Sequence, residues 1–342
     1  MLNIKTLVNI EGKGVLLRAN FDVPLCSTQG KLVIADDTRI LESLPTIKYL
    51  LGQKAQQIII ISHLGRPEGK VVPELSLEPV AQKLAGLLNL KFKIENFKTF
   101  KIGKDILLLE NLRFDSSEEA NDEGFAKKLS LLGDFFVNDA FAASHREHAS
   151  IVGVPKFFPP DKRALGFEFL KEIELLTKVR ENPARPVVLI LGGGKEDKLE
   201  QLTQLTEWAD QVLIGGRLPA ILGKEVQGLK SSRVQIASLN PEGKDITPES
   251  AAEFKKVIAL AKTVVWAGPV GDFYDEKQLA GTKAIAEAVA ESSAFTVIGG
   301  GDTEAALTKF GLTERINFIS SGGGAMLAFL AQGDLPGLKA IC

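Results

Sequence analysis

Short apolar runs alternate with amphipathic stretches along the whole chain. In the first half, runs rich in Val, Ile, Leu and Phe predict strands at residues 15–18, 57–62, 91–94, 106–109 and 135–138. Apolar residues recur at helical spacing in the stretches between them, which predicts helices at residues 37–51, 77–88 and 118–132. Buried apolar strands that alternate with helices are typical of parallel β–α–β units covered on both faces.

The second half of the chain repeats this pattern. It predicts strands at residues 187–191, 211–214, 263–266, 295–298 and 317–320. No fixed repeat period is present, which excludes a solenoid. Between the halves, apolar residues at helical spacing over residues 165–180 predict a linking helix, with Pro159 and Pro160 before it and Pro183 after it.

These elements predict an α/β protein with two doubly wound, parallel-sheet (Rossmann-like) domains joined by a hinge helix. The length of 342 residues also favours two domains. We place the first domain at residues 1–160, the interdomain helix at 161–182 and the second domain at 183–329.

Composition narrows the class of protein. A net charge of -2 argues against a dedicated nucleic-acid binder, which normally carries a strongly basic domain. Two cysteines, Cys26 and Cys342, cannot build a disulfide framework or a multi-cysteine zinc site, which fits a reducing compartment. Residues 1–13 lack the pattern of a signal peptide, and no apolar run approaches the ~18 residues that span a bilayer. We expect a cytoplasmic protein that binds neither nucleic acid nor membrane.

Cationic and polar residues follow the strands of the first half. In open α/β sheets, ligands bind beyond the carboxyl ends of the strands. The residues found there, together with Arg39 at the start of the first helix, are Arg18, Asn20, Asp22, His63, Arg66, Asn111, Arg113, His145 and Arg146. Arginine presents a planar fork that matches carboxylate and phosphate, so the set indicates a multiply charged anionic substrate. The alternative is a set of surface ion pairs with nearby carboxylates such as Asp36 and Glu147. His148 trails the motif and is assigned a structural role.

Glycines follow the strands of the second half, at residues 192–194, 215–216, 268–271, 299–301 and 322–324. Glycine lets backbone N–H groups approach a phosphate closely, and the N-terminus of a helix favours negative charge. The alternative is that these glycines only permit tight turns. Five such turns on one sheet edge favour a nucleotide platform.

The common nucleotide fingerprints are absent: the chain contains neither G-x-x-x-x-G-K-[ST] nor G-x-G-x-x-G. Asp302 stands beside a glycine run and is a candidate ligand for Mg²⁺, which commonly takes one or two carboxylates plus phosphate oxygens. An anion site in one domain and a phosphate site in the other indicate phosphoryl transfer that requires domain closure and exclusion of water.

Ten motifs in order resemble those of the phosphoglycerate kinase family almost end to end. They include RANFDVPL from Arg18, SHLGRP from Ser62, LENLRF from Leu109, ILGGGKEDK from Ile190 and VIGGGDT from Val297. The resemblance implies reversible transfer of the acyl phosphate of 1,3-bisphosphoglycerate to ADP, giving 3-phosphoglycerate and ATP, with Mg²⁺ as cofactor. It also implies that the C-terminal residues 330–342 return to the first domain, and that the protein is a monomer.

The resemblance assigns roles residue by residue. It implies that the catalytic groups are Arg39, Lys198, Gly301 and Gly324. The implied substrate-binding residues are Asn20, Phe21, Asp22, Arg39, His63, Leu64, Gly65, Arg66, Arg113, His145 and Arg146. The implied nucleotide-binding residues are Gly193, Lys195, Lys198, Gly215, Pro269, Tyr274, Gly300, Gly301, Asp302 and Thr303, with Asp302 as the Mg²⁺ ligand.

The sequence departs from the family pattern at several points. Asn20 and Asp22 exchange the family's acid and amide, Ala267 replaces an Asn, and Tyr274 replaces a Glu that contacts the ribose, for which Asp272 or Asp275 could substitute. Lys195 and Lys198 stand one residue closer together than usual, and residues 223–245 are short for the family. Two alternatives therefore stand beside the kinase: a non-catalytic homologue that binds an anionic metabolite or a partner protein, and a kinase for a different carboxylate or nucleotide.

Overall fold

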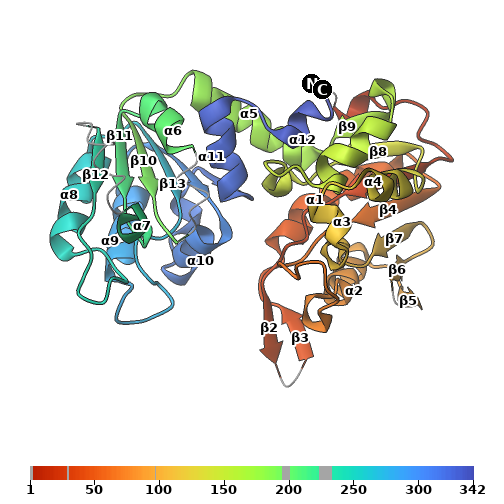
Figure 1. Cartoon of the computed structure of the whole chain (residues 1–342), viewed down its shortest axis with the longest axis horizontal. Helices are drawn as coiled ribbons and strands as arrows, with labels where there is room; N and C mark the ends of the chain where they lie inside the picture. Colours follow the sequence, from red (N-terminus) through yellow and green to blue (C-terminus); the bar gives the residue numbers. More distant parts are fainter. Residues whose placement is uncertain (1–2, 29–30, 97, 195–200, 223–232) are drawn as a thin grey trace. The chain divides into compact units, whose positions relative to one another are not determined.

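The computed structural model describes residues 3–28, 31–96, 98–194, 201–222 and 233–342. The chain divides into two compact units (Figure 1). Unit 1 comprises Met1–Glu174 and Asp334–Cys342, and unit 2 comprises Leu175–Gly333. The division falls inside helix α5 (Phe167–Glu181), within the stretch that the sequence assigns to the interdomain helix.

Unit 1 is built on a seven-stranded sheet in the order β5-β6-β7-β4-β1-β8-β9. The strands are β1 (Gly14–Arg18), β4 (Gln57–Ile61), β5 (Phe92–Asn96), β6 (Thr99–Ile102), β7 (Ile106–Leu109), β8 (Phe135–Asn138) and β9 (Arg163–Leu165). The sheet is parallel from β7 to β9, as predicted. Strands β5 and β6 extend it with an antiparallel edge that the sequence analysis did not predict.

The helices of unit 1 follow the predicted pattern with one difference. They are α1 (Thr38–Gly52), α2 (Glu78–Leu88), α3 (Ser116–Glu119), α4 (Glu123–Ser130) and the C-terminal α12 (Pro336–Lys339). The single helix predicted at residues 118–132 is wrong. Asn121 adopts a left-handed conformation with φ of 53°, and Asp122 caps a new helix by accepting a hydrogen bond from the Phe125 N–H at 2.7 Å.

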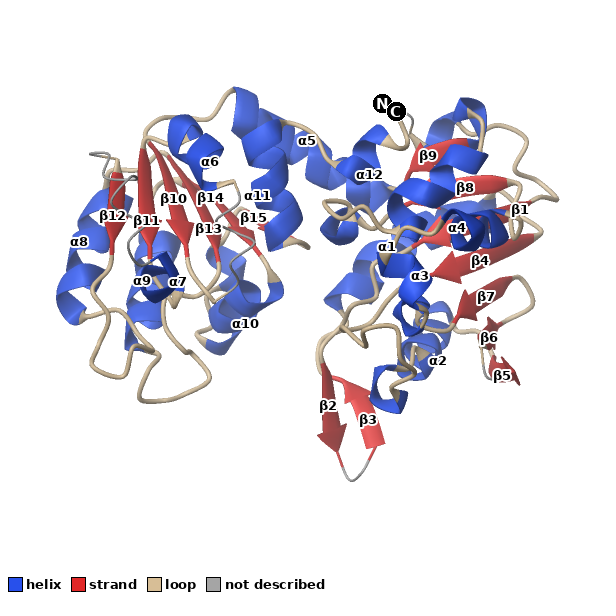
Figure 2. Ribbon diagram, in the orientation of Figure 1, coloured by secondary structure: helices blue, strands red, loops and turns tan. Residues whose placement is uncertain are grey.

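Two further features belong to unit 1. Strands β2 (Leu25–Thr28) and β3 (Lys31–Ile34) pair as an antiparallel hairpin outside the main sheet (Figure 2). The C-terminal segment packs on this unit: the Gly337 N–H donates to the Ser144 carbonyl at 2.9 Å, and Arg163 Nε donates to the Ile341 carbonyl at 3.2 Å.

Unit 2 is built on a six-stranded, wholly parallel sheet in the order β12-β11-β10-β13-β14-β15. Its strands are β10 (Val187–Leu191), β11 (Gln211–Ile214), β12 (Val234–Ile236), β13 (Thr263–Ala267), β14 (Phe295–Gly299) and β15 (Phe318–Ser320). The chain leaves β10 toward one edge and later returns to add β13 on the other side. This doubly wound order creates a switch point between β10 and β13, which is where such sheets bind ligands.

Helices cover both faces of this second sheet (Figure 2). They are α6 (Leu202–Trp208), α7 (Leu218–Leu222), α8 (Pro248–Ala259), α9 (Ala280–Glu291), α10 (Gly301–Lys309) and α11 (Gly323–Gln332). Phe254 of α8 and Ile285 of α9 pack with the fully buried Trp266 of β13 in one core cluster. None of the described helices is both long enough and apolar enough to cross a membrane.

Candidate functional site

The parallel strands of unit 1 bring the predicted anion-binding residues to one edge of the sheet. Strands β1, β4, β7 and β8 run in the same direction, so the segments that follow them meet beyond their carboxyl ends. These segments carry most of the cationic set derived from the sequence. The structure therefore gathers residues that are more than a hundred positions apart in the chain.

Asp22 lies at the centre of this edge. Its Oδ1 accepts a hydrogen bond from the Gly65 N–H at 2.8 Å. Its Oδ2 lies 3.7 Å from Arg39 Nη1 and 3.8 Å from His63 Nε2. Arg39 Nη1 also donates to the Asp22 carbonyl oxygen. Asp22 thus fixes the loop after β4 and holds the Arg39 side chain beside the strand ends.

Arg113 supports the same loop from β7. Its Nη1 donates to the Gly65 carbonyl at 2.8 Å, and its Nε lies 3.2 Å from Glu119 Oε1. Burial, partly offset by the nearby carboxylates, lowers the pKa of Arg113 below its ordinary value. Gly65 has a φ of +63°, and a Cβ there would lie 2.8 Å from the Leu75 side chain, so this turn requires glycine.

Asn20 presents an unsatisfied carboxamide at this edge. The residue is 5% exposed, and among the described residues neither its Oδ1 nor its Nδ2 has a hydrogen-bond partner. A buried polar group without a partner is costly unless a ligand satisfies it. Because Asn20 lies just beyond the end of β1 at Arg18, this observation supports the predicted binding role for the exchanged Asn20-Phe21-Asp22 motif.

His63 is held as a neutral imidazole. Burial is the first cause that lowers its pKa well below 6.5, and the positive charges of Arg113, Arg18 and Arg39 act in the same direction. Arg18 Nη2 lies 2.9 Å from His63 Nδ1. Arg18 itself is fully buried, and burial lowers its pKa to about 10. It therefore faces the protein interior, although the sequence placed it among the anion-binding candidates.

The remaining predicted residues of unit 1 differ in exposure. The side chains of Phe21 and Leu64 lie in the core, which leaves their backbone groups for any ligand. Arg66 is exposed, whereas His145 and Arg146 are partly buried on the loop after β8. His148 is partly buried, and burial together with the charges of Arg113 and Arg18 lowers its pKa to about 3.

Sequence reasoning missed two residues behind this edge. Glu118 and Ser150 are both fully buried and are hydrogen-bonded to each other. Glu118 stood at the start of a predicted helix, where a Glu is usually solvated, and Ser150 lay within a family motif but was given no role. A carboxylate on the buried side of an amphipathic helix is the signal that could have revealed Glu118.

In unit 2, the glycine loops lie at the carboxyl edge of the sheet and pack against one another. The Gly193 N–H donates to the Pro269 carbonyl at 2.7 Å, and the Gly216 N–H donates to the Val270 carbonyl at 3.0 Å. A Cβ on Gly192 would lie 2.3 Å from the Pro269 carbonyl oxygen. These glycines allow neighbouring loops to approach closely at the switch point. The N–H groups of Gly193 and Gly216 are used in hydrogen bonds within the protein.

The N-termini of α10 and α11 have a different character. The first N–H groups of a helix have no acceptor within the helix, and the helix dipole adds positive potential there. Helix α10 begins at Gly301 after Gly300, whose φ of +97° requires glycine, and α11 begins at Gly323. The Thr303 side chain is buried and accepts a hydrogen bond from the Gly268 N–H at 2.7 Å, so it positions the start of α10. Both helix starts suit phosphate.

The donor set fits a phosphate-bound magnesium ion. Asp302 is exposed in the first turn of α10. Among the described residues, no three His, Cys, Asp or Glu side chains gather as an all-protein metal site. Magnesium is commonly held by one or two carboxylates together with substrate phosphates, and Asp302 beside a phosphate-binding helix start meets that requirement.

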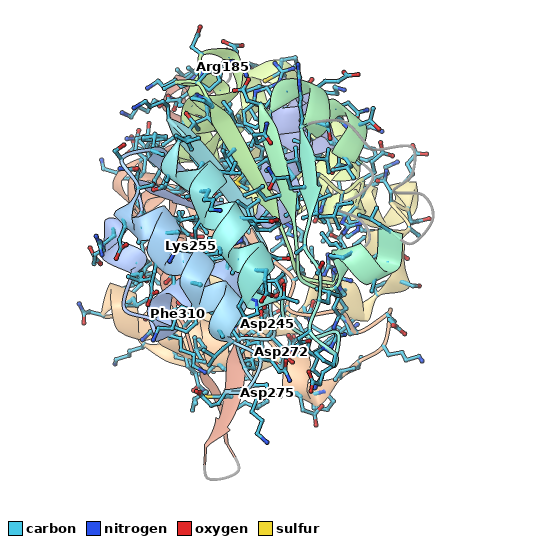
Figure 3. The ribbon with its side chains drawn as sticks, turned by 90° about the vertical axis from the view of Figure 1, so that its left-hand side faces the viewer. Arg185, Asp245, Lys255, Asp272, Asp275 and Phe310 are labelled. Carbon is cyan, nitrogen blue, oxygen red and sulfur yellow. The ribbon has the colours of Figure 1, made fainter. Side chains whose placement is uncertain are left out.

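The predicted ribose-contacting position is occupied by an aromatic side chain. Tyr274 is 72% exposed and lies against Phe273, with ring centroids 4.1 Å apart. Burial and the charges of Asp302 and Asp272 raise its pKa. Figure 3 shows Asp272 and Asp275 at the end of unit 2 opposite Arg185, which precedes β10. These carboxylates therefore lie at the same end of the sheet as the glycine loops. Lys195 and Lys198 lie outside the described residues.

Two Rossmann-like units, one with a cationic edge and one with two helix starts suited to phosphate, define a two-domain phosphotransferase. Comparison with known proteins identifies its family. The phosphoglycerate kinase family model matches residues 4–236 and 220–333. The chain belongs to the phosphoglycerate kinase family, whose members transfer phosphoryl groups in glycolysis.

Relatives and solved structures agree with this assignment. The chain is 38% identical over 395 positions to phosphoglycerate kinase of Thermosipho africanus, covering 98% of this chain and 96% of the relative. It is 40% identical over 398 positions to that of Salinibacter ruber, covering 98% and 97%. The solved phosphoglycerate kinase of Pyrococcus horikoshii is 30% identical with a TM-score of 0.80, covering 100% of this chain and 98% of the other. That of Coxiella burnetii is 33% identical with a TM-score of 0.75, covering 99% and 98%.

The comparisons also locate the shortening of this chain. The alignment with the Thermosipho africanus protein spans 395 positions, whereas this chain has 342 residues. The difference of 53 is the smallest number of alignment positions at which this chain has a gap. The family model matches in two segments that overlap at residues 220–236. Much of the missing length therefore falls near this point, in agreement with the short stretch 223–245 noted in the sequence.

Proposed function

We propose that this chain catalyses the reversible, Mg²⁺-dependent transfer of a phosphoryl group between 1,3-bisphosphoglycerate and ADP, giving 3-phosphoglycerate and ATP. The observation that carries the proposal is the Asn20 carboxamide, which is buried without a partner among the cations that follow β1, β4 and β7. A small polyanion with hydroxyl groups would satisfy the carboxamide and neutralise those cations.

In this proposal, unit 1 binds the triose acceptor. Arg39, Arg66 and Arg113 supply positive charge, while neutral His63 donates a hydrogen bond. His145 and Arg146 approach from the loop after β8. Asp22 keeps Arg39 in place by the contacts described above, so that its guanidinium faces the transferring phosphoryl group.

Unit 2 binds the adenine nucleotide. The N-termini of α10 and α11, including Gly301 and Gly324, hold the nucleotide phosphates, and Asp302 holds Mg²⁺. The ion would neutralise the charge of the nucleotide phosphates when bound there. Lys195 and Lys198 keep the phosphate-binding roles that the family resemblance implies.

The reaction needs no general base. The nucleophile is an ADP phosphate oxygen in one direction and a carboxylate in the other, and carboxylates with pKa values near 4 are already ionised at pH 7. The protein must position the groups in line and stabilise the charge of the transferring phosphoryl group, which arginine and helix N-termini can do. Because acceptor and nucleotide residues belong to different units, the proposal includes the closure step expected from the sequence.

The proposal extends to the state of the protein in the cell. We infer a cytoplasmic monomer that uses 3-phosphoglycerate and adenine nucleotide and binds neither nucleic acid nor membrane. We also infer that residues 1–160 with 330–342 act as the acceptor domain, residues 183–329 as the nucleotide domain, and residues 161–182 as the helix between them.

A coupled assay with 3-phosphoglycerate, ATP and Mg²⁺ tests the proposal directly. We expect turnover, and we expect Arg39→Ala to lower kcat/KM by roughly a thousandfold or more, because a lost arginine at a transferring phosphoryl group costs about that much. Lys48→Ala is the matched control: it removes an exposed cation from the same helix, and its activity is expected to remain within twofold of the wild type.

Other outcomes separate the alternatives. Absence of turnover with intact binding of 3-phosphoglycerate, measured by calorimetry, would favour the non-catalytic homologue. Turnover that is faster with GDP than with ADP, or with another carboxylate as acceptor, would favour the kinase of different specificity. Equal loss of activity in Lys48→Ala and Arg39→Ala would contradict the role given to Arg39.

A further inference from the structure

A chain of buried hydrogen bonds runs from α3 to His63. The Ser150 N–H donates to Glu118 Oε2 at 2.9 Å, and the Ser150 hydroxyl lies 2.5 Å from Glu118 Oε1. Arg18 Nε donates to the same hydroxyl oxygen at 2.8 Å. Glu118, Ser150 and Arg18 are all 0% exposed, so these bonds are shielded from water.

The donor and acceptor counts fix the direction of each bond. The Ser150 hydroxyl has one proton, which it gives to the Glu118 carboxylate, and its lone pair then accepts from Arg18. A guanidinium donates only. The contact of 2.9 Å between Arg18 Nη2 and His63 Nδ1 therefore requires an unprotonated Nδ1.

This requirement determines the tautomer of His63. A neutral imidazole carries one proton, so when Nδ1 accepts, the proton is on Nε2. Nε2 lies 3.8 Å from Asp22 Oδ2, which is beyond hydrogen-bond distance. The Nε2–H group therefore lies on the Asp22 side of the ring, where it can donate to an anionic ligand.

Charge balance explains why Glu118 is needed. A guanidinium buried without a counter-charge would carry a large desolvation penalty, and Glu118 is among the carboxylates whose charge favours the charged form of Arg18. Ser150 joins the two through hydrogen bonds and sets the orientation of the guanidinium. Removing either residue would leave the Arg18 guanidinium held by the bond from Nη1 to the Ala19 carbonyl at 2.6 Å, and would loosen its orientation toward His63.

We propose that Glu118 and Ser150 are positioning residues of the acceptor site, which act through Arg18 to hold His63 as the Nε2–H tautomer. The proposal rests on the acceptor-binding role of His63 in the proposed function. It adds a reason for that role, because only this tautomer directs an N–H toward the ligand side of the ring.

The wild-type protein gives the first test. The chain has 3 histidines, so two-bond ¹H–¹⁵N correlation spectra of the substrate-free protein contain three imidazole patterns, and His63→Gln assigns one of them. We expect the His63 pattern of a neutral Nε2–H ring between pH 6 and 8. An Nδ1–H pattern or an imidazolium pattern would overturn the proposal, and apart from the assigning His63→Gln this measurement uses the wild-type protein alone.

Two variants give the second test. Ser150→Ala breaks the connection between Arg18 and Glu118, and Glu118→Gln removes the charge while keeping one acceptor oxygen. In both, we expect His63 to show mixed tautomers and the KM for 3-phosphoglycerate to rise about tenfold, the effect of weakening a charged hydrogen bond. The change in kcat is expected to be smaller.

Matched controls separate positioning from folding. Ser130→Ala removes another buried serine hydroxyl, which donates to the Lys127 carbonyl at 2.8 Å, and Glu123→Gln neutralises an exposed carboxylate in the first turn of α4. Both controls are expected to keep the wild-type His63 pattern and KM. An unchanged His63 pattern in folded Ser150→Ala would overturn the proposal. If His63 had the predicted tautomer but the protein had no kinase activity, the proposed function would be contradicted. The role of the hydrogen-bond chain in setting the tautomer would still be established.

Discussion

Asp139 anchors the start of α5 through Glu168: Asp139 Oδ1 accepts hydrogen bonds from the backbone N–H groups of Glu168 at 3.0 Å and of Phe169 at 3.2 Å. A Cβ on Gly166 would lie 2.2 Å from the same oxygen, so the carboxylate occupies the space that a side chain would need. Asp139 directly follows β8, at the start of the loop that carries His145. The acceptor loop and the helix that leaves unit 1 are therefore joined at one buried carboxyl group.

This contact predicts a pH dependence of stability. Burial is the main cause that raises the pKa of Asp139 from 3.8 to about 7, and the charge of Glu168 adds to it. Between these two pH values, the folded protein binds more protons at Asp139 than the unfolded chain does. The free energy of unfolding therefore falls as pH rises from about 4 to about 7, by on the order of a few kcal/mol, and this contribution is constant above that range.

Asp139→Asn tests the assignment. The amide oxygen can still accept from the N–H groups of Glu168 and Phe169, but the side chain no longer titrates. Urea unfolding followed by circular dichroism from pH 5 to 8 is expected to show a weaker pH dependence than in the wild type, with the variant more stable at pH 8. A pH dependence equal to that of the wild type would show that Asp139 is not the titrating group.

Two glycines pack against another buried carboxylate, Asp245. Asp245 Oδ2 accepts from the Gly281 N–H at 2.8 Å at the start of α9. A Cβ would lie 2.4 Å from Asp245 Oδ1 at Gly281, and 1.8 Å from it at Gly271. We expect Gly281→Ala to lower the free energy of unfolding by about 2–4 kcal/mol, because a buried carboxylate has little room to move.

Gly86 supplies the matched control. It also lies in a helix, α2, but a Cβ there would meet no atom within 4 Å. Gly86→Ala is expected to raise the free energy of unfolding by about 0.5–1 kcal/mol, because alanine loses less backbone entropy in a helix. If thermal unfolding showed that both substitutions change the free energy of unfolding in the same direction, close packing would not be the reason for glycine at position 281.

The strands that were predicted and those that were missed differ in length and in setting. Continuous apolar runs such as Val187–Leu191 identify central parallel strands, because both faces of such strands are buried. The missed strands are short or lie at edges. Strand β9 has 3 residues and β12 has 3, too few for any periodicity, and β6 belongs to an antiparallel edge and has one face that is only half-buried.

The candidate site was predictable to the extent that it depends on residue type and strand order. Arg39, His63 and Arg113 reach one sheet edge because parallel strands all end there. Hydrogen-bond partners could not be predicted from the sequence. Nothing in the pattern of residues indicates that Arg18 points inward, or that the Gly193 N–H donates to Pro269. Those facts depend on how loops from different strands pack, which is set by three-dimensional contacts.

The tyrosine at position 274 leads us to expect a nucleotide pocket that differs from the family pattern. Its ring is exposed and packs at a tilt against Phe273, at the position where the family resemblance places a ribose-binding Glu. An exposed aromatic ring can contribute about 1–3 kcal/mol by stacking on a base or sugar. We expect Tyr274→Ala to raise the KM for ADP about tenfold with little change in the KM for 3-phosphoglycerate. Tyr274→Phe keeps the ring and is expected to behave as the wild type; a loss in Tyr274→Phe equal to that in Tyr274→Ala would assign the effect to the hydroxyl.

The unsatisfied carboxamide of Asn20 leads us to expect that replacing it makes the protein more stable and less active. Leucine has nearly the same shape as asparagine and no polar atoms, so Asn20→Leu removes a buried amide that lacks partners within the described protein. We expect the free energy of unfolding to rise by about 1 kcal/mol, and kcat/KM for 3-phosphoglycerate to fall about a hundredfold. Equilibrium urea unfolding and the coupled assay measure the two effects on the same preparation.

Asn111→Leu is the contrasting variant, since it changes an equally buried asparagine whose partners are all within the protein. Its Nδ2 donates to the Leu64 carbonyl at 2.7 Å and to the Leu75 carbonyl at 2.9 Å. Losing both bonds leaves two buried carbonyls unsatisfied, so this variant is expected to lose about 2–4 kcal/mol. Opposite signs for the two substitutions would show that the protein keeps the Asn20 carboxamide at a cost in stability, as a ligand-binding group requires. If Asn20→Leu destabilised the protein as strongly as Asn111→Leu, then Asn20 would have a structural partner and would not be a group reserved for the acceptor.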